Sequence, residues 1–386
     1  MATGTTQGTR TVNGLTYRIT PPAPTRERPA PARGLRQPRR FMSLVGGLLL
    51  LLAFALPFID ASPYTISVAT SAFIYIMLAM GLNIVVGYAG LLDLGYYAFF
   101  AVGAYTSGVL ATNDMPLVFT VPFVIVACIG AGIIIGGPTL RLRSDYLAIV
   151  TLGFGEIIRL TANNLDITGG PSGISGIPTF GLFGWTFRDG LDLFGIHFSG
   201  NILLYWTAVL AGGGFTVLAV TRLGRGRLGR AWRAIKDDED AAEAMGINTY
   251  LTKLAAYILG AIFGGLAGIL MAAHQTAISP TSFIFLNSAL LLMAVVLGGM
   301  GSTPGVIIGA LVIWLAPELL RDFANWRYLM FGLLLVLVMI FRPQGLWPST
   351  AVLPFLHFRE KGRSPREGFT DHSEPVENVD RSEELA

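Results

Sequence analysis

Few residues in this chain have types and spacings that could do chemistry. The sequence contains no GxSxG, HExxH or GxxxxGKS/T motif, and its single cysteine, Cys128, has no partner for a disulfide or a Cys/His metal cluster. The pattern therefore predicts no catalytic residue, no metal and no cofactor in this chain. Polar side chains within long apolar stretches are limited to Asn83, Asp93, Glu156, Arg159, His274, Asn287 and Glu318.

Three of these polar residues, Asn83, Asp93 and Glu156, are candidates for lining or supporting a solute pathway or gate. A charge near the centre of a bilayer costs roughly 2.5–3.5 kcal/mol, so none of them is expected to face lipid. Asp93 follows a glycine-rich break and is expected to cap the next helix. Glu156 and Arg159 lie three residues apart on one helical face, which favours a structural pair over a pathway role.

The surrounding composition is that of a membrane protein. The 386 residues are 53% hydrophobic and 13% charged, against roughly a quarter charged in soluble domains, and the mean hydropathy is +0.60. We predict an all-α, polytopic transmembrane helical bundle with eight to ten spans. The candidate spans are 41–58, 64–86, 91–112, 116–137, 146–161, 201–221, 253–273, 286–301, 304–320 and 327–341.

Arginine-rich segments set the expected orientation, because cytoplasmic loops of membrane proteins carry excess Lys and Arg. Ten spans place the basic stretch before residue 41, the loop with Arg141 and Arg143, the segment 222–252 and the exit at Arg342 on the cytoplasmic side. Residues 1–40 are expected to be disordered, and residues 349–386 to form a polar tail, with both termini cytoplasmic. We attribute the excess of basic residues in these loops to membrane topology, and we expect no nucleic-acid partner.

The largest loop on the outer side is predicted at 162–200. It contains the glycine- and proline-rich stretch Thr168–Pro178, followed by aromatic residues that could rest at the membrane interface. Two interpretations stay open: a plain connector, or a surface that meets an extracytoplasmic partner.

Glycines cluster within the apolar stretches. Gly260, Gly264 and Gly268 are spaced by four, which predicts close packing of two helices. Two other clusters, Gly81–Gly90 and Gly298–Gly305, interrupt apolar runs. We expect them to be tight turns near the inner face, with gate hinges as the alternative.

The long polar segment 222–252 separates two apolar stretches. Good helix formers from Arg230 to Met245 followed by Gly246 predict one helix with a glycine stop. Ala241, Ala242 and Met245 are expected to form a small apolar patch within a ring of acidic residues, suited to docking into a partner's groove. The alternative is a simple amphipathic loop without a partner.

Several of these stretches resemble one family. GLNIVVGYAGLLDLGYYAFFAVGAY (81–105), RLRSDYLAIVTLGFGEIIR (141–159), NNLDITGGPSGISGIP (163–178), GRAWRAIKDDEDAAEAMGIN (229–248) and LVIWLAPELL (311–320), with the exit FRPQGLWP (341–348), are similar to LivM-type permease subunits of branched-chain amino acid ABC importers. The resemblance covers roughly residues 41–348 and implies an ABC importer permease fold over that range.

The resemblance also implies an assembly in a bacterial plasma membrane. Its parts are a related LivH-like permease, two cytoplasmic LivG/LivF-like ATPases that bind ATP and Mg, and an extracytoplasmic solute-binding protein. Asp240–Gly246 is similar to the EAA-x3-G coupling motif of ABC permeases, with Asp in place of the first Glu and without an evident I-x-L-P ending. The implied ATPase-coupling residues are Arg230, Asp240, Ala241, Ala242, Glu243 and Gly246.

Alternative functions stay open from the sequence. Urea and short-chain amide importers have similar permeases, although the stretch DITGGPSGISGIP is closer to the amino acid group. An ion-coupled secondary carrier is a different class, but the runs of intramembrane acids that such carriers use are sparse here. A membrane-embedded enzyme is disfavoured because no catalytic motif is present.

Overall fold

The computed structural model describes residues 8–12, 15–19, 39–60, 62–140, 144–182, 185–187, 190–193, 196–319, 332–333, 336 and 345–347. The chain divides into two compact units, Met1–Leu48 and Leu49–Ala386. The first unit contains an antiparallel hairpin of β1 (Gly8–Val12) and β2 (Leu15–Ile19), within the stretch predicted to be disordered. The polar tail 349–386 lies outside the described residues.

The second unit is built from helices, as its apolar stretches predict. In chain order these are α1 (Arg39–Ile59, which starts in the first unit), α2 (Pro63–Leu82), the π-helix η1 (Asn83–Tyr88), α3 (Tyr97–Thr112), α4 (Leu117–Thr139), α5 (Ser144–Asn164), α6 (Gly200–Ala208), the π-helix η5 (Val209–Thr216), α7 (Val217–Arg225), α8 (Arg227–Asp237), α9 (Glu239–Ala244), α10 (Thr249–Gln275), α11 (Phe285–Gly298) and α12 (Thr303–Leu319).

Each predicted span up to 304–320 overlaps one of these helices or one continuous run of them (α2–η1 and α6–η5–α7), whereas the span 327–341 lies largely outside the described residues. Within the described residues, four continuous helical stretches are long and apolar enough to cross a membrane: Pro63–Tyr88, Leu117–Thr139, Gly200–Arg225 and Thr249–Gln275. Gly46–Ile59, Tyr97–Thr112, Phe285–Gly298 and Thr303–Leu319 are shorter apolar helices. The all-α polytopic architecture is therefore confirmed.

One predicted boundary is wrong. The span expected at 91–112 begins as a helix only at Tyr97, because residues 89–96 form a non-helical segment that is largely buried except at Gly90 and Leu92. At 1.5 Å per residue, the sixteen residues of α3 extend only about 24 Å, less than the roughly 30 Å of a bilayer core. The preceding segment supplies the rest of the chain's path inside the protein.

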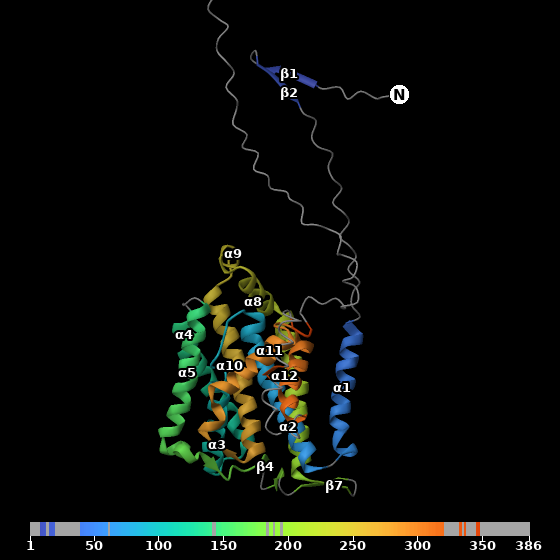
Figure 1. The fold of residues 1–386 in the computed structure, drawn as a ribbon, viewed down its shortest axis with the longest axis vertical. Coiled ribbons are helices and arrows are strands. Elements are labelled where there is room, and N and C mark those ends of the chain that lie inside the picture. The colour runs from blue at the N-terminus through green and yellow to red at the C-terminus, as the bar shows by residue number, and fades with distance from the viewer. Residues whose placement is uncertain are drawn as a thin grey trace, which may run out of the picture. The chain divides into compact units, whose positions relative to one another are not determined.

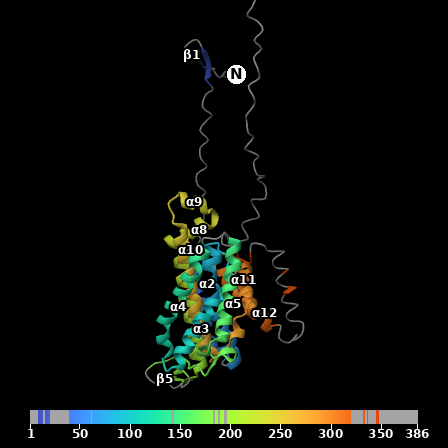
Figure 2. The same cartoon turned by 90° about the vertical axis from the view of Figure 1, so that its left-hand side faces the viewer.

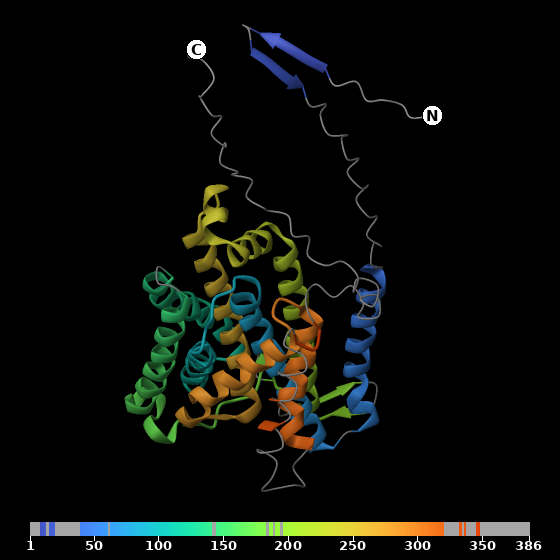
Figure 3. The ribbon, with the colours of Figure 1, turned by 45° about the horizontal axis from the view of Figure 1, so that its top comes forward.

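Helix α10 packs against α2, α3 and α4 (Figure 1, Figure 3). A Cβ added at Gly268 would lie 2.5 Å from the Phe100 carbonyl oxygen and 2.6 Å from the Ala104 nitrogen of α3. A Cβ at Gly264 would lie 3.2 Å from Phe99 Cβ, and one at Gly260 would lie 2.6 Å from Val85 Cγ2. These glycines let the backbones approach closely, which confirms the packing role predicted from their spacing.

The two polar regions lie at opposite ends of the second unit. Helices α8 and α9 are at one end, and the loop after α5 is at the other (Figure 1, Figure 2). That loop contains the short pairs β4–β5 (Gly181–Leu182, Trp185–Thr186) and β6–β7 (Leu191–Leu193, Ile196–Phe198). Its strand β3 (Ile174–Ser175) pairs with β8 (Ala277–Ile278) after α10, so the loop is attached to the bundle.

A substitution at the α3–α10 contact tests this packing. Gly268→Ala should destabilise the protein by about 1–3 kcal/mol, because the new methyl group collides with the backbone of α3. The matched control is Gly130→Ala on α4, where an added Cβ meets nothing within 4 Å. Thermal unfolding of the detergent-solubilised protein measures the difference, and equal midpoints for the two variants would contradict the packing role.

Candidate functional site: a junction between the polar segment and two helix breaks

The polar segment 222–252 leaves the bundle through a tight corner between α7 and α8. The side chain of Arg233 donates from Nη2 to the Gly224 carbonyl at 2.8 Å, and from Nε to the Gly229 carbonyl at 3.1 Å. Trp232 is fully buried and donates from Nε1 to the Thr252 carbonyl at 2.8 Å, which attaches α8 to the start of α10. Helix α8 is therefore firmly fixed to the spans on both sides.

The prediction of a single helix from Arg230 to Met245 is wrong, because the helix is interrupted at Asp238. This residue has extended backbone angles, and its carboxylate accepts the Ala241 N–H at 3.0 Å as the N-cap of α9. Asp prefers the N-cap position to a helix interior, so the sequence itself carried this signal. Glu239 in the first turn of α9 pairs with Lys253 of α10 and holds the short helix in place.

The predicted coupling residues lie on and beside α9. The side chains of Arg230, Asp240, Ala241 and Glu243 are exposed, whereas Ala242 is only 4% exposed. The predicted apolar patch is therefore incomplete: Ala242 packs inward while Met245 is 83% exposed. Gly246 follows with φ +83°, and a Cβ there would meet no atom within 4 Å. This glycine stops the helix, as predicted, and leaves open space beside it.

The glycine cluster after α2 forms the π-helix η1, which starts at Asn83. Asn83 is fully buried, and its Oδ1 accepts the Gly301 N–H at 2.9 Å. A Cβ at Gly87 would lie 2.6 Å from the same Gly301 nitrogen, so only glycine permits this approach. The two glycine-rich breaks, far apart in the sequence, thus meet directly. π-Helices frequently mark functional sites because their backbone is irregular.

The second break is also joined to residues 346–347. At the end of α11, the carbonyls of Leu297 and Gly298 accept the N–H groups of Leu346 and Trp347 at 2.7 Å and 3.0 Å. Ser302 Oγ accepts the Gly305 N–H at 3.3 Å. Irregular backbone within a membrane protein needs such internal partners, and here they come from residues on either side of the span predicted at 327–341.

Lys236 of α8 links the polar segment to η1. Its Nζ donates to the Gly87 carbonyl at 2.8 Å, and a Cβ at Gly90 would lie 2.9 Å from Lys236 Cγ. Partial burial lowers the pKa of Lys236, while the neighbouring Asp237 opposes that shift. A helix at the end of the bundle therefore contacts the backbone of a break inside it.

Tyr88 provides a second link at the same place. Its ring packs on Gly224, where an added Cβ would lie 2.8 Å from Tyr88 Cζ. Its hydroxyl shares a 3.4 Å hydrogen bond with Thr303 Oγ1 at the start of α12. Tyr88 thus joins the α7–α8 corner to the second break. Lys236, Tyr88 and Gly224 were not identified from the sequence, since nothing in their local pattern distinguishes them.

Asp93 lies in the non-helical segment before α3 and is 1% exposed. The prediction that Asp93 caps α3 is wrong, because its carboxylate instead accepts the Gly95 N–H at 2.8 Å within its own turn. The hydroxyls of Thr151 and Tyr257 lie beside the carboxylate, although Oδ2 has no partner at hydrogen-bonding geometry. Thr151 Oγ1 also accepts the Leu94 N–H at 3.1 Å, which fixes the segment against α5.

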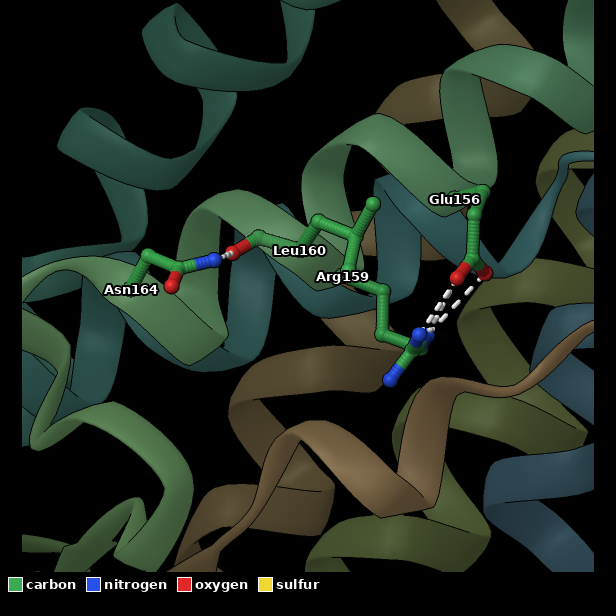
Figure 4. Close-up of polar contacts among 4 residues, drawn as sticks. All are labelled: Glu156, Arg159, Leu160 and Asn164. Atoms are coloured by element: carbon green, nitrogen blue, oxygen red, sulfur yellow. Dashed lines mark hydrogen bonds and ion pairs between the residues drawn. The ribbon is translucent and has the colours of Figure 1, made fainter.

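Glu156, the third candidate, differs from Asn83 and Asp93. It forms an ion pair with Arg159 one turn along α5, with both carboxylate oxygens accepting from Arg159 Nε at 3.0 Å (Figure 4). The favoured structural pair is therefore confirmed. The side chains are 43% and 23% exposed, so the pair is not buried in the bundle as the other two candidates are.

Residues 64–341 match the family described as "Branched-chain amino acid transport system / permease component". The chain belongs to this family. It is 47% identical to the high-affinity branched-chain amino acid transport system permease protein LivM of Escherichia coli (strain K12), over 78% of this chain and 74% of that protein. The LivM protein of Salmonella typhimurium (strain LT2) is 46% identical over the same shares.

More distant members of the family also match. The permease protein LivH of the same Escherichia coli strain is 25% identical, over 70% of this chain and 90% of its own length. No solved structure matches the chain. The family and the apolar helices together establish a multi-pass membrane permease component.

The contact between the two breaks generates a prediction for this permease. Asn83→Ala should lower the free energy of unfolding by about 1–3 kcal/mol, because the part-buried Gly301 N–H loses its acceptor, although removal of the unpartnered Asn83 Nδ2 offsets some of that loss. The control is Asn113→Ala at the exposed end of α3, where the amide only donates to the Val109 carbonyl of its own helix. Chemical denaturation in detergent measures both, and an Asn83→Ala variant as stable as Asn113→Ala would contradict the predicted contribution.

Proposed function

We propose that this chain is the translocating subunit of an ATP-driven importer for branched-chain or similar amino acids. The observation that carries the proposal is the series of contacts from the polar segment to both helix breaks. Lys236 holds the Gly87 carbonyl of η1, and Asn83 in the same π-helix holds Gly301 of the second break. A displacement of α8 would therefore change both breaks together.

In this mechanism, separate cytoplasmic ATPases bind ATP and Mg and push on α8 and α9. Arg230, Asp240, Ala241, Ala242, Glu243 and Gly246 form or support the contact surface, while Trp232 and Arg233 keep α8 rigid. Because helices kink at π-helical turns, η1 is a place where the span can bend at a low cost in free energy. Bending at η1 and at Gly299–Ser302 would alternate the openings of the bundle, with Asn83 and Asp93 as polar gate supports.

The proposed assembly contains a related LivH-like permease, two LivG/LivF-like ATPases and an extracytoplasmic solute-binding protein. The N- and C-termini are cytoplasmic in this assembly, as the distribution of arginines predicts, and the loop containing β3 to β7 faces the binding protein. Reaction energy comes from ATP in the partner chains, so this chain needs no catalytic residue.

Reconstitution tests the proposal. Proteoliposomes that contain this chain with its permease and ATPase partners should accumulate leucine when the binding protein and ATP are supplied. Accumulation of urea or short-chain amides in place of leucine would assign the alternative solute. Uptake by this chain alone, driven by an ion gradient, would contradict the proposed function.

Gly246 offers a test of the ATPase contact. Gly246→Asn adds a side chain to open space next to α9, and asparagine tolerates positive φ. We expect leucine transport to fall by about tenfold while ATP hydrolysis continues, as an interface side chain worth about 1.4 kcal/mol would produce. The control is Gly137→Asn near the end of α4, where an added Cβ meets only the Tyr250 hydroxyl oxygen at 3.8 Å. Full transport by Gly246→Asn would argue against the coupling surface.

Lys236 offers a separate test of transmission within the bundle. Lys236→Met keeps the aliphatic packing on Gly90 but removes the hydrogen bond to the Gly87 carbonyl. The ATPases should still co-purify, because Lys236 lies outside the proposed docking surface, while transport per ATP hydrolysed falls severalfold. An unchanged ratio of transport to hydrolysis would exclude Lys236 as a coupling residue.

A further inference from the structure

The exposed face of α5 differs from the other apolar faces of the described bundle because an ion pair lies at its edge. Tyr146, Ile149, Ile157 and Leu160 recur at helical spacing and are 62%, 67%, 59% and 44% exposed. Gly153 lies in the same stripe, and a Cβ there would meet nothing within 4 Å. Glu156 lies at the edge of the stripe, paired with Arg159, with 43% of its side chain exposed.

The position of the ion pair along the helix makes lipid an unfavourable neighbour. In α5 (Ser144–Asn164), Glu156 is only about 3 Å and Arg159 about 8 Å from the helix midpoint, at 1.5 Å per residue. Among the other described spans, charged side chains lie close to helix ends, as Lys253, Arg222 and Glu318 do. A half-exposed pair near the middle of a span would leave polar groups unsatisfied in hydrocarbon.

The opposite side of α5 is already occupied by this chain. An added Cβ at Gly155 would lie 3.3 Å from Gly95 Cα, and Thr151 is hydrogen-bonded to the segment before α3. No described residue covers the stripe, and a charged pair near the middle of a span favours a protein neighbour over lipid. A neighbour that covers the stripe must be apolar along most of its length, approach closely at Gly153 and present a polar group to Glu156.

We propose that this face of α5 is the contact surface for a homologous permease subunit, whose membrane helix covers Gly153 and hydrogen-bonds to the Glu156–Arg159 pair. The inference rests on the proposed function, which calls for a second, related permease. A membrane-spanning helix has the length and the apolar character that such a cover requires. In Escherichia coli (strain K12), two distinct permease proteins of this family, LivM and LivH, match this chain.

Site-specific photo-crosslinking tests the surface directly. A photo-reactive phenylalanine derivative replaces Ile157 in membranes that contain the complete transporter. The control replaces Val126 on α4, a span with no charged residue, whose side chain is 69% exposed. We expect irradiation to join this chain to the homologous permease from position 157, and to lipid alone from position 126.

Three results would overturn the proposal. These are lipid adducts alone from position 157, adducts with a second copy of this chain, or equal joining of the homologous permease from both positions. ATP-driven leucine uptake is measured in the same membranes. If uptake persists while position 157 reaches only lipid, the surface is wrong and the proposed function stands. If no ATPase co-purifies with the chain and no ATP-driven uptake occurs, the proposed function fails.

The ion pair supplies a second, independent variant. Arg159→Leu leaves Glu156 without its partner at the contact, and the yield of co-purified homologous permease should fall by about tenfold. The double exchange Glu156→Arg with Arg159→Glu retains a pair at the same positions and should recover most of that yield. Wild-type yield from Arg159→Leu would contradict a contact at this pair, whatever the thermal stability of the variant.

Discussion

Backbone polar groups that leave regular helices must find partners inside this protein, and the junction described above follows from that constraint. The π-helix η1 and the segment between α11 and α12 are not α-helical, yet both are held inside the bundle. Their N–H and carbonyl groups are bonded by Asn83, Lys236, Ser302 and the residues after 344. Because hydrocarbon offers no hydrogen bonds, each freed group ties one segment to another.

The same ties make the junction suited to transmitting movement. A continuous α-helix satisfies its own backbone and can slide past its neighbours, whereas a broken one depends on them. Lys236 and Tyr88 bring the end of the bundle that carries α8 into contact with both breaks. In the proposed function, this link gives the polar segment a mechanical role that needs no catalytic group.

The polar residues of the spans divide into two groups by environment. Asn83 and Asp93 are buried, and each accepts a backbone N–H group of a non-helical segment, which stabilises that segment. Glu156 and Arg159 satisfy each other on the surface of α5. Glu156 is 43% and Arg159 23% exposed, and the proposed permease contact would cover this pair.

The sequence alone determined the helical class, the position of nearly every described span and the glycine stop at Gly246, because hydropathy and capping are local properties. It also predicted the Glu156–Arg159 pair, since three residues of a helix fix that distance. Tertiary structure alone decided that Lys236 reaches Gly87, 149 positions away, and that Asn83 reaches Gly301, 218 positions away. No local pattern encodes those contacts, because they depend on how α2, α8 and α11 pack together and on which backbone groups the packing leaves unpaired.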